Sequence, residues 1–113
     1  MSAVEKVGYY PLMLKHLRAR WPEIDVPPDE PTWLLYELDE QLDAVVRSAD
    51  VFADGSVARN SIEIEERGGK PCPSLIDCSL AEGFAGVDAE QITPEEFEAV
   101  WARGFDKPFW NVS

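Results

Sequence analysis

Apolar residues recur at helical spacing near the N-terminal end of the sequence. In "PLMLKHLRARW", Leu14, Leu17 and Trp21 follow Pro11 on one side of a helix, so we expect a short amphipathic helix over about 11–20. Its polar face would be basic, because Lys15 and Arg18 lie on it. The next stretch, "PEIDVPPDEP", is too rich in proline for a helix or a central strand and predicts an extended arm.

A second helical pattern, "ITPEEFEAVWARG", carries its own start and stop signals. Thr93 is suited to cap a helix and Glu96 to complete a capping box. Pro94 fits the first helical position and Gly104 the stop. We therefore predict a helix over 94–103. Its buried face would consist of Phe97, Val100 and Trp101.

The central part of the chain fits both helical and strand periods. In "TWLLYELDEQLDAVV", Leu34, Leu38 and Leu42 form a helical stripe, whereas "TWLLYEL" has the aromatic and apolar content of a buried strand. The acids of "DEQLD" and the pair Asp54-Gly55 both favour turns. We therefore predict that the apolar runs of this region form three antiparallel strands. These strands are 32–38, 44–52 and 56–66.

The hairpin around Gly55 allows two registers. A bulge at Gly55 after a type I turn would set Val51 opposite Val57 and Val46 opposite Ile62. A two-residue turn would instead set Phe52 opposite Val57 and Asp50 opposite Arg59. We prefer the first register, because it pairs apolar residues with each other. It sends Ile62 and Ile64 into the core. The same register turns the side chains of Arg47, Arg59, Glu63 and Glu65 toward solvent.

These elements predict one α+β domain: an antiparallel meander of about three to four strands, packed by the C-terminal helix and preceded by a short N-terminal helix. A chain of 113 residues with 45% apolar content suffices for one compact core. We divide it into the helix and proline-rich arm (1–28), the core (29–103) and an aromatic tail (104–113) that should dock back. The segment 67–91 reads as a long loop of unassigned role with one short strand at "SLID".

Charge restricts the possible partners. The sequence has 22 acidic and 10 basic residues, a net charge of -12 and a pI near 4.3. Residues 1–20 carry +3, which leaves -15 on 21–113. Such a body does not suit direct binding of nucleic acid; it suits a basic protein surface or serves solubility alone. The apolar runs are far shorter than the roughly 20 residues of a membrane span, and the N-terminal end lacks a signal-like apolar region, so we expect a cytoplasmic protein.

The residues with catalytic or metal-binding potential form no recognisable site. His16 is the sole histidine and is expected on the surface of the N-terminal helix. The spacing of Cys72 and Cys78 does not suit a zinc site, so both should be reduced thiols. Ser74 lacks a nucleophile elbow, and no phosphate-binding glycine loop occurs. We therefore expect no enzyme, no metal and no cofactor.

Three segments in order, "DEPTWLLYELDE", "VVRSADVFADGS" and "ITPEEFEAVWA", resemble a group of small bacterial proteins built on a domain of unknown function. In that group an E-P segment ending in L-Y-E-L-D precedes an arginine-bearing strand, an F-x-D-G hairpin and an F-E-x-x-W helix. The resemblance covers about 29–103. It implies an α+β domain with an antiparallel sheet and a packed helix, supports a strand over 32–38, and implies no activity.

Two classes of function are favoured over a third, a small enzyme working through Cys72 or a pair of carboxylates. The first is an acidic protein-binding module, an inhibitor similar in general character to immunity proteins or antitoxins, that covers a basic site on a partner. The alternative is a nucleic-acid mimic that inhibits a DNA-processing or defence protein. The oligomeric state stays open. The partner-binding residues we expect are Glu37, Asp39, Glu40 and Asp43 in an acidic loop, and Asp50, Arg59, Glu63 and Glu65 on a sheet face.

Overall fold

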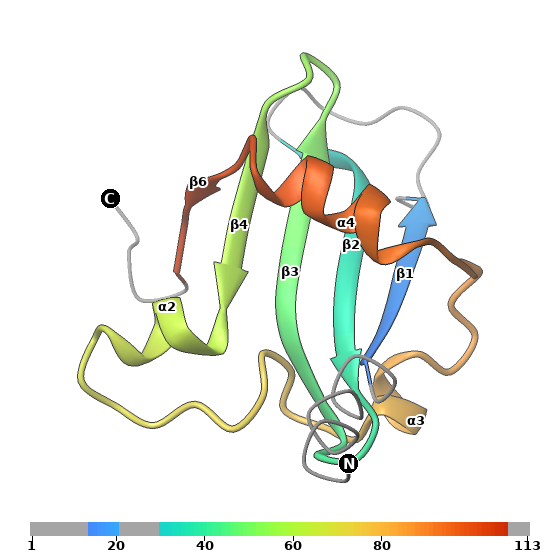
Figure 1. Ribbon diagram of the computed structural model, residues 1–113. Coiled ribbons are helices and arrows are strands. Elements are labelled where there is room, and N and C mark those ends of the chain that lie inside the picture. The colour runs from blue at the N-terminus through green and yellow to red at the C-terminus, as the bar shows by residue number, and fades with distance from the viewer. Residues whose placement is uncertain (1–13, 21–29, 109–113) are drawn as a thin grey trace, which may run out of the picture.

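A six-stranded, mostly antiparallel sheet forms the body of the computed structural model, which describes residues 14–20 and 30–108 (Figure 1). The strand order is β5-β1-β2-β3-β4-β6, and only the β4–β6 pair is parallel. The α+β class is thus confirmed, with more strands than the sequence indicated. The elements are β1 (Leu14–Arg20), β2 (Pro31–Asp39), β3 (Ala44–Phe52), β4 (Val57–Ser61), α2 (Ile62–Glu66), α3 (Leu80–Gly83), β5 (Ala89–Gln91), α4 (Pro94–Trp101) and β6 (Phe105–Asp106).

The central hairpin has the predicted register. β2 and β3 lie within a residue or so of the predicted strands, and Val51 pairs with Val57 across the β3–β4 turn. Gly55 has a φ of 89°, and its N–H donates to the Phe52 carbonyl at 2.9 Å. This left-handed residue provides the bulge that brings Val51 opposite Val57.

The predicted N-terminal helix is wrong for residues 14–20, which form strand β1. β1 pairs with β2 along its whole length, from Leu14 opposite Asp39 to Arg20 opposite Trp33. A short helix with weak intrinsic preference gains less than this pairing provides, so tertiary contacts decide. β1 is therefore part of the core sheet and not of a preceding arm. Residues 11–13 and the proline-rich segment 21–29 lie outside the described residues.

The predicted strand over 56–66 is wrong beyond Ser61, where the chain turns into helix α2. The Ser61 hydroxyl caps this helix by accepting a hydrogen bond from the Ile64 N–H at 2.9 Å. The alternation in "IEIEE" fits a strand, but the cap and the acids of the first turn favour a helix. Ile64 is buried as expected, whereas the Val46–Ile62 pair does not form.

Helix α4 lies across one face of the sheet (Figure 1). Its predicted capping box is present: the Thr93 hydroxyl accepts from the Glu96 N–H at 3.1 Å, and the Glu96 carboxylate accepts from the Thr93 N–H at 3.0 Å. The helix ends at Trp101, two residues before the predicted end. Its Phe97 side chain is fully buried against Leu35, Ala49, Val57 and Ile92.

A second apolar cluster lies on the opposite face, beneath the long loop. The Leu75 N–H donates to the Val45 carbonyl, and the Val45 N–H donates to the Ser74 hydroxyl, both at 2.9 Å. "SLID" forms no strand; it fixes the loop to β3 so that its apolar side chains cover the sheet. In the aromatic tail, Phe105 enters β6 but stays 53% exposed, and residues 109–113 lie outside the described residues.

Candidate functional site

The end of β2 and the connection to β3 form a hydrogen-bonded acidic turn, Asp39–Asp43, with one apolar side chain among its acids. The Asp39 Oδ1 accepts hydrogen bonds from the backbone N–H groups of Gln41 and Leu42 at 3.0 and 3.1 Å. Such bonds from an Asp side chain to the following backbone stabilise tight turns. Leu42 is 65% exposed, the largest exposed fraction among the big apolar side chains of the described residues.

The second half of the acidic turn is held to the rest of the molecule. Asp43 adopts a left-handed backbone with a φ of 55°, and its Oδ1 accepts from the Leu80 N–H at 2.9 Å at the start of α3. Glu40 forms an exposed ion pair with Lys15 of β1 at 2.9 Å. Three of the predicted partner-binding residues, Asp39, Glu40 and Asp43, therefore lie together in a fixed conformation.

Glu37 does not belong to this surface. Its side chain is buried and accepts two hydrogen bonds from the Arg47 guanidinium at 2.6 and 2.7 Å, while His16 Nε2 lies 2.9 Å from its Oε2. Burial alone would raise the pKa of the Glu37 carboxyl, but the hydrogen bonds from Arg47 and His16 hold it below the usual range. His16 is only 5% exposed, so the expectation of a surface histidine is wrong.

The arginines of the β3–β4 hairpin attach α4 to the sheet. Arg47 also donates to Glu98 of α4, and its guanidinium lies 4.8 Å from the ring centres of both Phe97 and Trp101. Arg59 donates to the Trp101 carbonyl and to Asp106, each at 2.8 Å. Neither arginine is therefore an unpaired cation on a sheet face; both hold α4 against the sheet.

The remaining predicted residues are scattered. Glu63 of α2 pairs with Arg67, the residue that follows the helix, and Glu65 accepts from the Asn60 side chain. Asp50 points away from α4, because its neighbours Ala49 and Val51 pack toward that helix. Burial raises the pKa of the Asp50 carboxyl, and the positive charge of Lys107 only partly offsets this increase. The single acidic sheet face expected from Asp50, Glu63 and Glu65 does not form, since α2 carries the two glutamates.

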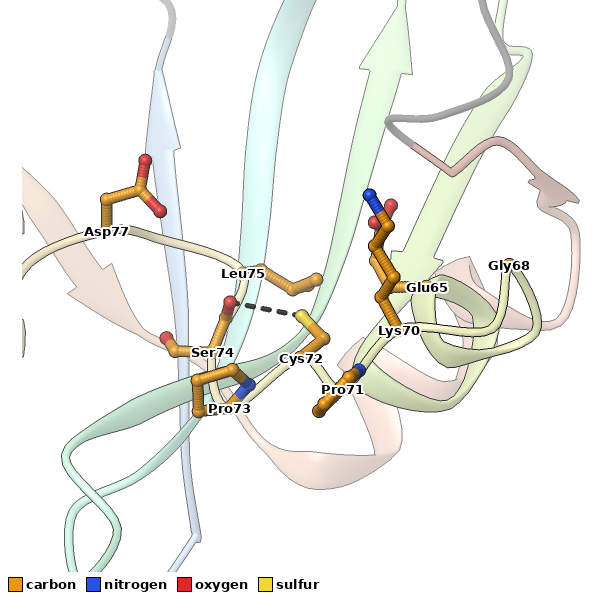
Figure 2. Close-up of a pocket in the computed structure, with 9 residues that line it drawn as sticks. All are labelled: Glu65, Gly68, Lys70, Pro71, Cys72, Pro73, Ser74, Leu75 and Asp77. Carbon is orange, nitrogen blue, oxygen red and sulfur yellow. Dashed lines mark hydrogen bonds between the residues drawn. The ribbon is translucent and has the colours of Figure 1, made fainter.

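Cys72 of the long loop is one of the residues that line a cavity of about 590 Å³ (Figure 2). The Cys72 thiol donates to the Ser74 carbonyl at 3.2 Å, and burial raises its pKa further than this bond lowers it. A thiol of raised pKa is a poor nucleophile. His16 cannot activate it, because the imidazole lies on the α4 side of the sheet against Phe97. Within the described residues no cluster of His, Cys, Asp and Glu could hold a metal ion.

The described residues thus form a small α+β domain with an acidic turn that presents one exposed leucine. The chain belongs to the family described as Domain of unknown function (DUF6881), whose model matches residues 15–106. This match confirms the suspected family and extends it to β1. No curated protein and no solved structure matches the chain. No helix in the described ranges is long and apolar enough to cross a membrane.

Proposed function

We propose that this chain is a protein-binding module of the immunity or antitoxin type, which uses the acidic turn to cover a basic site on one partner protein. The observation that carries the proposal is Leu42, 65% exposed between acids that are held in a fixed turn. A basic cleft would receive the apolar side chain at its centre and the carboxylates of Asp39, Glu40 and Asp43 at its rim.

The rigidity of the turn favours tight binding. Its backbone is held by the Asp39 carboxylate and by the bond from Leu80 to Asp43, so little conformational entropy is lost on association. Asp39 and Asp43 each use one oxygen in these bonds and leave the second without a partner among the described residues. Both second oxygens are therefore able to accept from lysine or arginine.

Long-range charge supports the same proposal. A net charge of -12 attracts a basic partner and raises the rate of encounter. This attraction acts over about 8–10 Å at physiological salt and weakens as salt is added. The proposal includes the cytoplasmic location expected from the sequence.

The experiment is capture from a lysate of the source cell, followed by identification of the bound protein and measurement of its affinity for the purified chain. We expect one basic protein, released at high salt, whose activity the chain inhibits. Leu42→Ser should weaken binding at least roughly tenfold, because burying a leucine contributes about 1.5–3 kcal/mol. Phe105→Ser is the matched control: it removes an exposed apolar side chain from β6 and should leave the affinity unchanged.

Equal binding by the wild-type chain and Leu42→Ser would contradict the proposal, as would a partner indifferent to salt. A nucleic-acid mimic is distinguished by the same set of variants. For a mimic, Asp39→Asn, Glu40→Gln and Asp43→Asn should each lower the affinity by a similar small factor, several DNA-binding proteins should be captured, and Leu42→Ser should be nearly silent.

A further inference from the structure

A groove of about 340 Å³ lies between α4 and strands β1–β3, on the same face of the sheet as α4. Its apolar wall is formed by Leu35 and Val51 of the sheet and by Ile92 and Val100. Arg18, Trp33 and Arg103 also line it, so we call it the arginine groove. Neither the acidic turn nor the cavity around Cys72 shares a lining residue with this groove.

Trp33 is the aromatic centre of the groove. The guanidinium of Arg18 lies 4.9 Å from the ring centre of Trp33, and that of Arg20 lies 5.0 Å away. Arg18 is also bonded to Glu90 on the neighbouring strand β5. Because these contacts hold the Arg18 side chain, its charge is fixed beside the tryptophan before any ligand binds.

Arg20, beside Trp33, and Arg103, in the groove lining, have no carboxylate partner within residues 14–20 and 30–108. Among the described residues no ion pair involves Arg20 or Arg103, although the chain has more than twice as many acids as bases. Glu96 also lines the groove, and its Oε1 accepts from the Thr93 N–H in the capping box. This bond, and to a smaller extent Arg18, lowers the pKa of the Glu96 carboxyl, so Glu96 contributes a negative charge to the groove. Three guanidiniums, those of Arg18, Arg20 and Arg103, thus stand against two carboxylates, those of Glu90 and Glu96, which leaves a small positive excess on a strongly negative molecule.

Size and charge together restrict the ligand. A volume of about 340 Å³ is at the low end of small-molecule sites, which span roughly 300–1,000 Å³. A long polyanion is disfavoured, because the net charge of -12 would repel the parts of it outside the groove. An apolar wall next to guanidinium groups suits an apolar or aromatic group that carries one carboxylate, since arginine binds carboxylates through two parallel hydrogen bonds.

We propose that the arginine groove binds a small carboxylate with an apolar or aromatic body, of about the size of one amino-acid residue. The body lies against Leu35, Val51 and Val100, and the carboxylate reaches Arg103 and the arginines beside Trp33. This site is independent of the proposed protein-binding turn.

N-acetylphenylalanine is a suitable probe, titrated into the isotope-labelled chain and followed by NMR. We expect shifts of the Trp33 indole N–H and of the amides of Val51, Ala99 and Val100, with a dissociation constant on the order of 1 mM. N-acetylphenylalanine amide has the same body without the charge and should bind roughly tenfold more weakly or not at all. Equal binding of acid and amide would overturn the proposal.

Arg103→Glu tests the site from the protein side. Arg103 is exposed, so the fold should persist, and the affinity for N-acetylphenylalanine should fall by roughly tenfold or more. Lys70→Glu makes the same change of charge on an exposed residue outside the groove and should alter the affinity less than about twofold. Equal losses in both variants would show that only the general field of the protein attracts the acid.

Peptides separate a small carboxylate from the end of a protein chain. A tetrapeptide that ends in phenylalanine with a free carboxylate should bind no better than N-acetylphenylalanine, because the groove has room for about one residue. Clearly tighter binding of the tetrapeptide would contradict the proposed ligand and assign the groove to a peptide C-terminus.

Discussion

At the scale of single residues, the most consequential group is the buried Glu37 carboxylate. It joins three separate elements: His16 of β1, Glu37 itself on β2 and Arg47 of β3, with a further bond from Arg47 to α4. A buried carboxylate of this kind is tolerated only when its bonds are complete. Its removal would leave the Arg47 guanidinium and the imidazole without their shared acceptor.

Replacing Glu37 with glutamine should lower the free energy of unfolding by about 3 kcal/mol near neutral pH. The loss should shrink in acid. The pKa of Glu37 is lower in the folded state than its unfolded value of about 4.3, so its stabilisation is complete above that value and is lost as the pH falls through the folded pKa. Urea unfolding of Glu37→Gln and wild type from neutral pH to about pH 3 measures both effects.

The matched control is Glu40→Gln, which removes a carboxylate from an exposed ion pair with Lys15 and should leave the unfolding curve nearly unchanged. Two outcomes would contradict a stabilising role of the ion-pair network. One is a free energy of unfolding that Glu37→Gln lowers no more than Glu40→Gln does, and the other is a Glu37→Gln effect that grows as the pH falls.

The sequence could not reveal this network, for a physical reason. Glu37 and His16 are 21 positions apart, and they meet only because β1 and β2 pair in one register. Local periodicity predicts whether a segment is a helix or a strand, but not which other segments pack beside it. The available signal was the alternation within β1, which sets His16 and Arg18 on one face and Leu17 and Ala19 on the other.

At the scale of elements, the successes and the errors have different causes. β2, β3, the Gly55 turn and the start of α4 follow from local signals: strand-forming residues, a glycine with positive φ and a capping box. β1 was missed because its state depends on pairing with β2. α2 was missed because "IEIEE" fits both periods, and the Ser61 cap decides between them.

Helix α2 gives a test at this scale. Ile64 is 3% exposed, so Ile64→Ala should open a core cavity and lower the free energy of unfolding by about 2–5 kcal/mol. Glu63→Gln, one position earlier on the exposed side, should leave the melting temperature nearly unchanged. Thermal melts of both variants provide the measurement. If Ile64→Ala left the melting temperature unchanged and Glu63→Gln lowered it strongly, the buried and exposed faces of α2 would be assigned the wrong way round.

At the scale of the whole molecule, the surplus of acids acts on the fold as well as on a partner. A net charge of -12 on 113 residues repels itself in the compact state more than in the unfolded chain. The ion pairs of Arg47 and Arg59 oppose this locally. They are partly buried and in direct contact, so salt screens them less than it screens the distant acids.

Added salt should therefore stabilise the chain. Raising NaCl from about 0.01 M to about 0.15 M shortens the screening length from about 30 to 8 Å, and the melting temperature should rise by several degrees. Calorimetry across this range is the measurement, with sucrose at matched osmolality as the control for nonspecific effects. A melting temperature that falls with salt would mean that attractive surface pairs outweigh the general repulsion.

The strand order β5-β1-β2-β3-β4-β6 has a consequence for the growing chain. β5 covers β1 over Leu17–Ala19 and β6 covers β4 at Ala58 and Arg59, so part of each margin of the β1–β4 sheet is covered by a short strand that comes late in the sequence. During synthesis the four longer strands emerge first and expose two unpaired margins able to recruit strands from neighbouring chains. Residues 89–106 thus protect β1 and β4 from pairing with strands of other chains, but only after this last part of the chain has been synthesised.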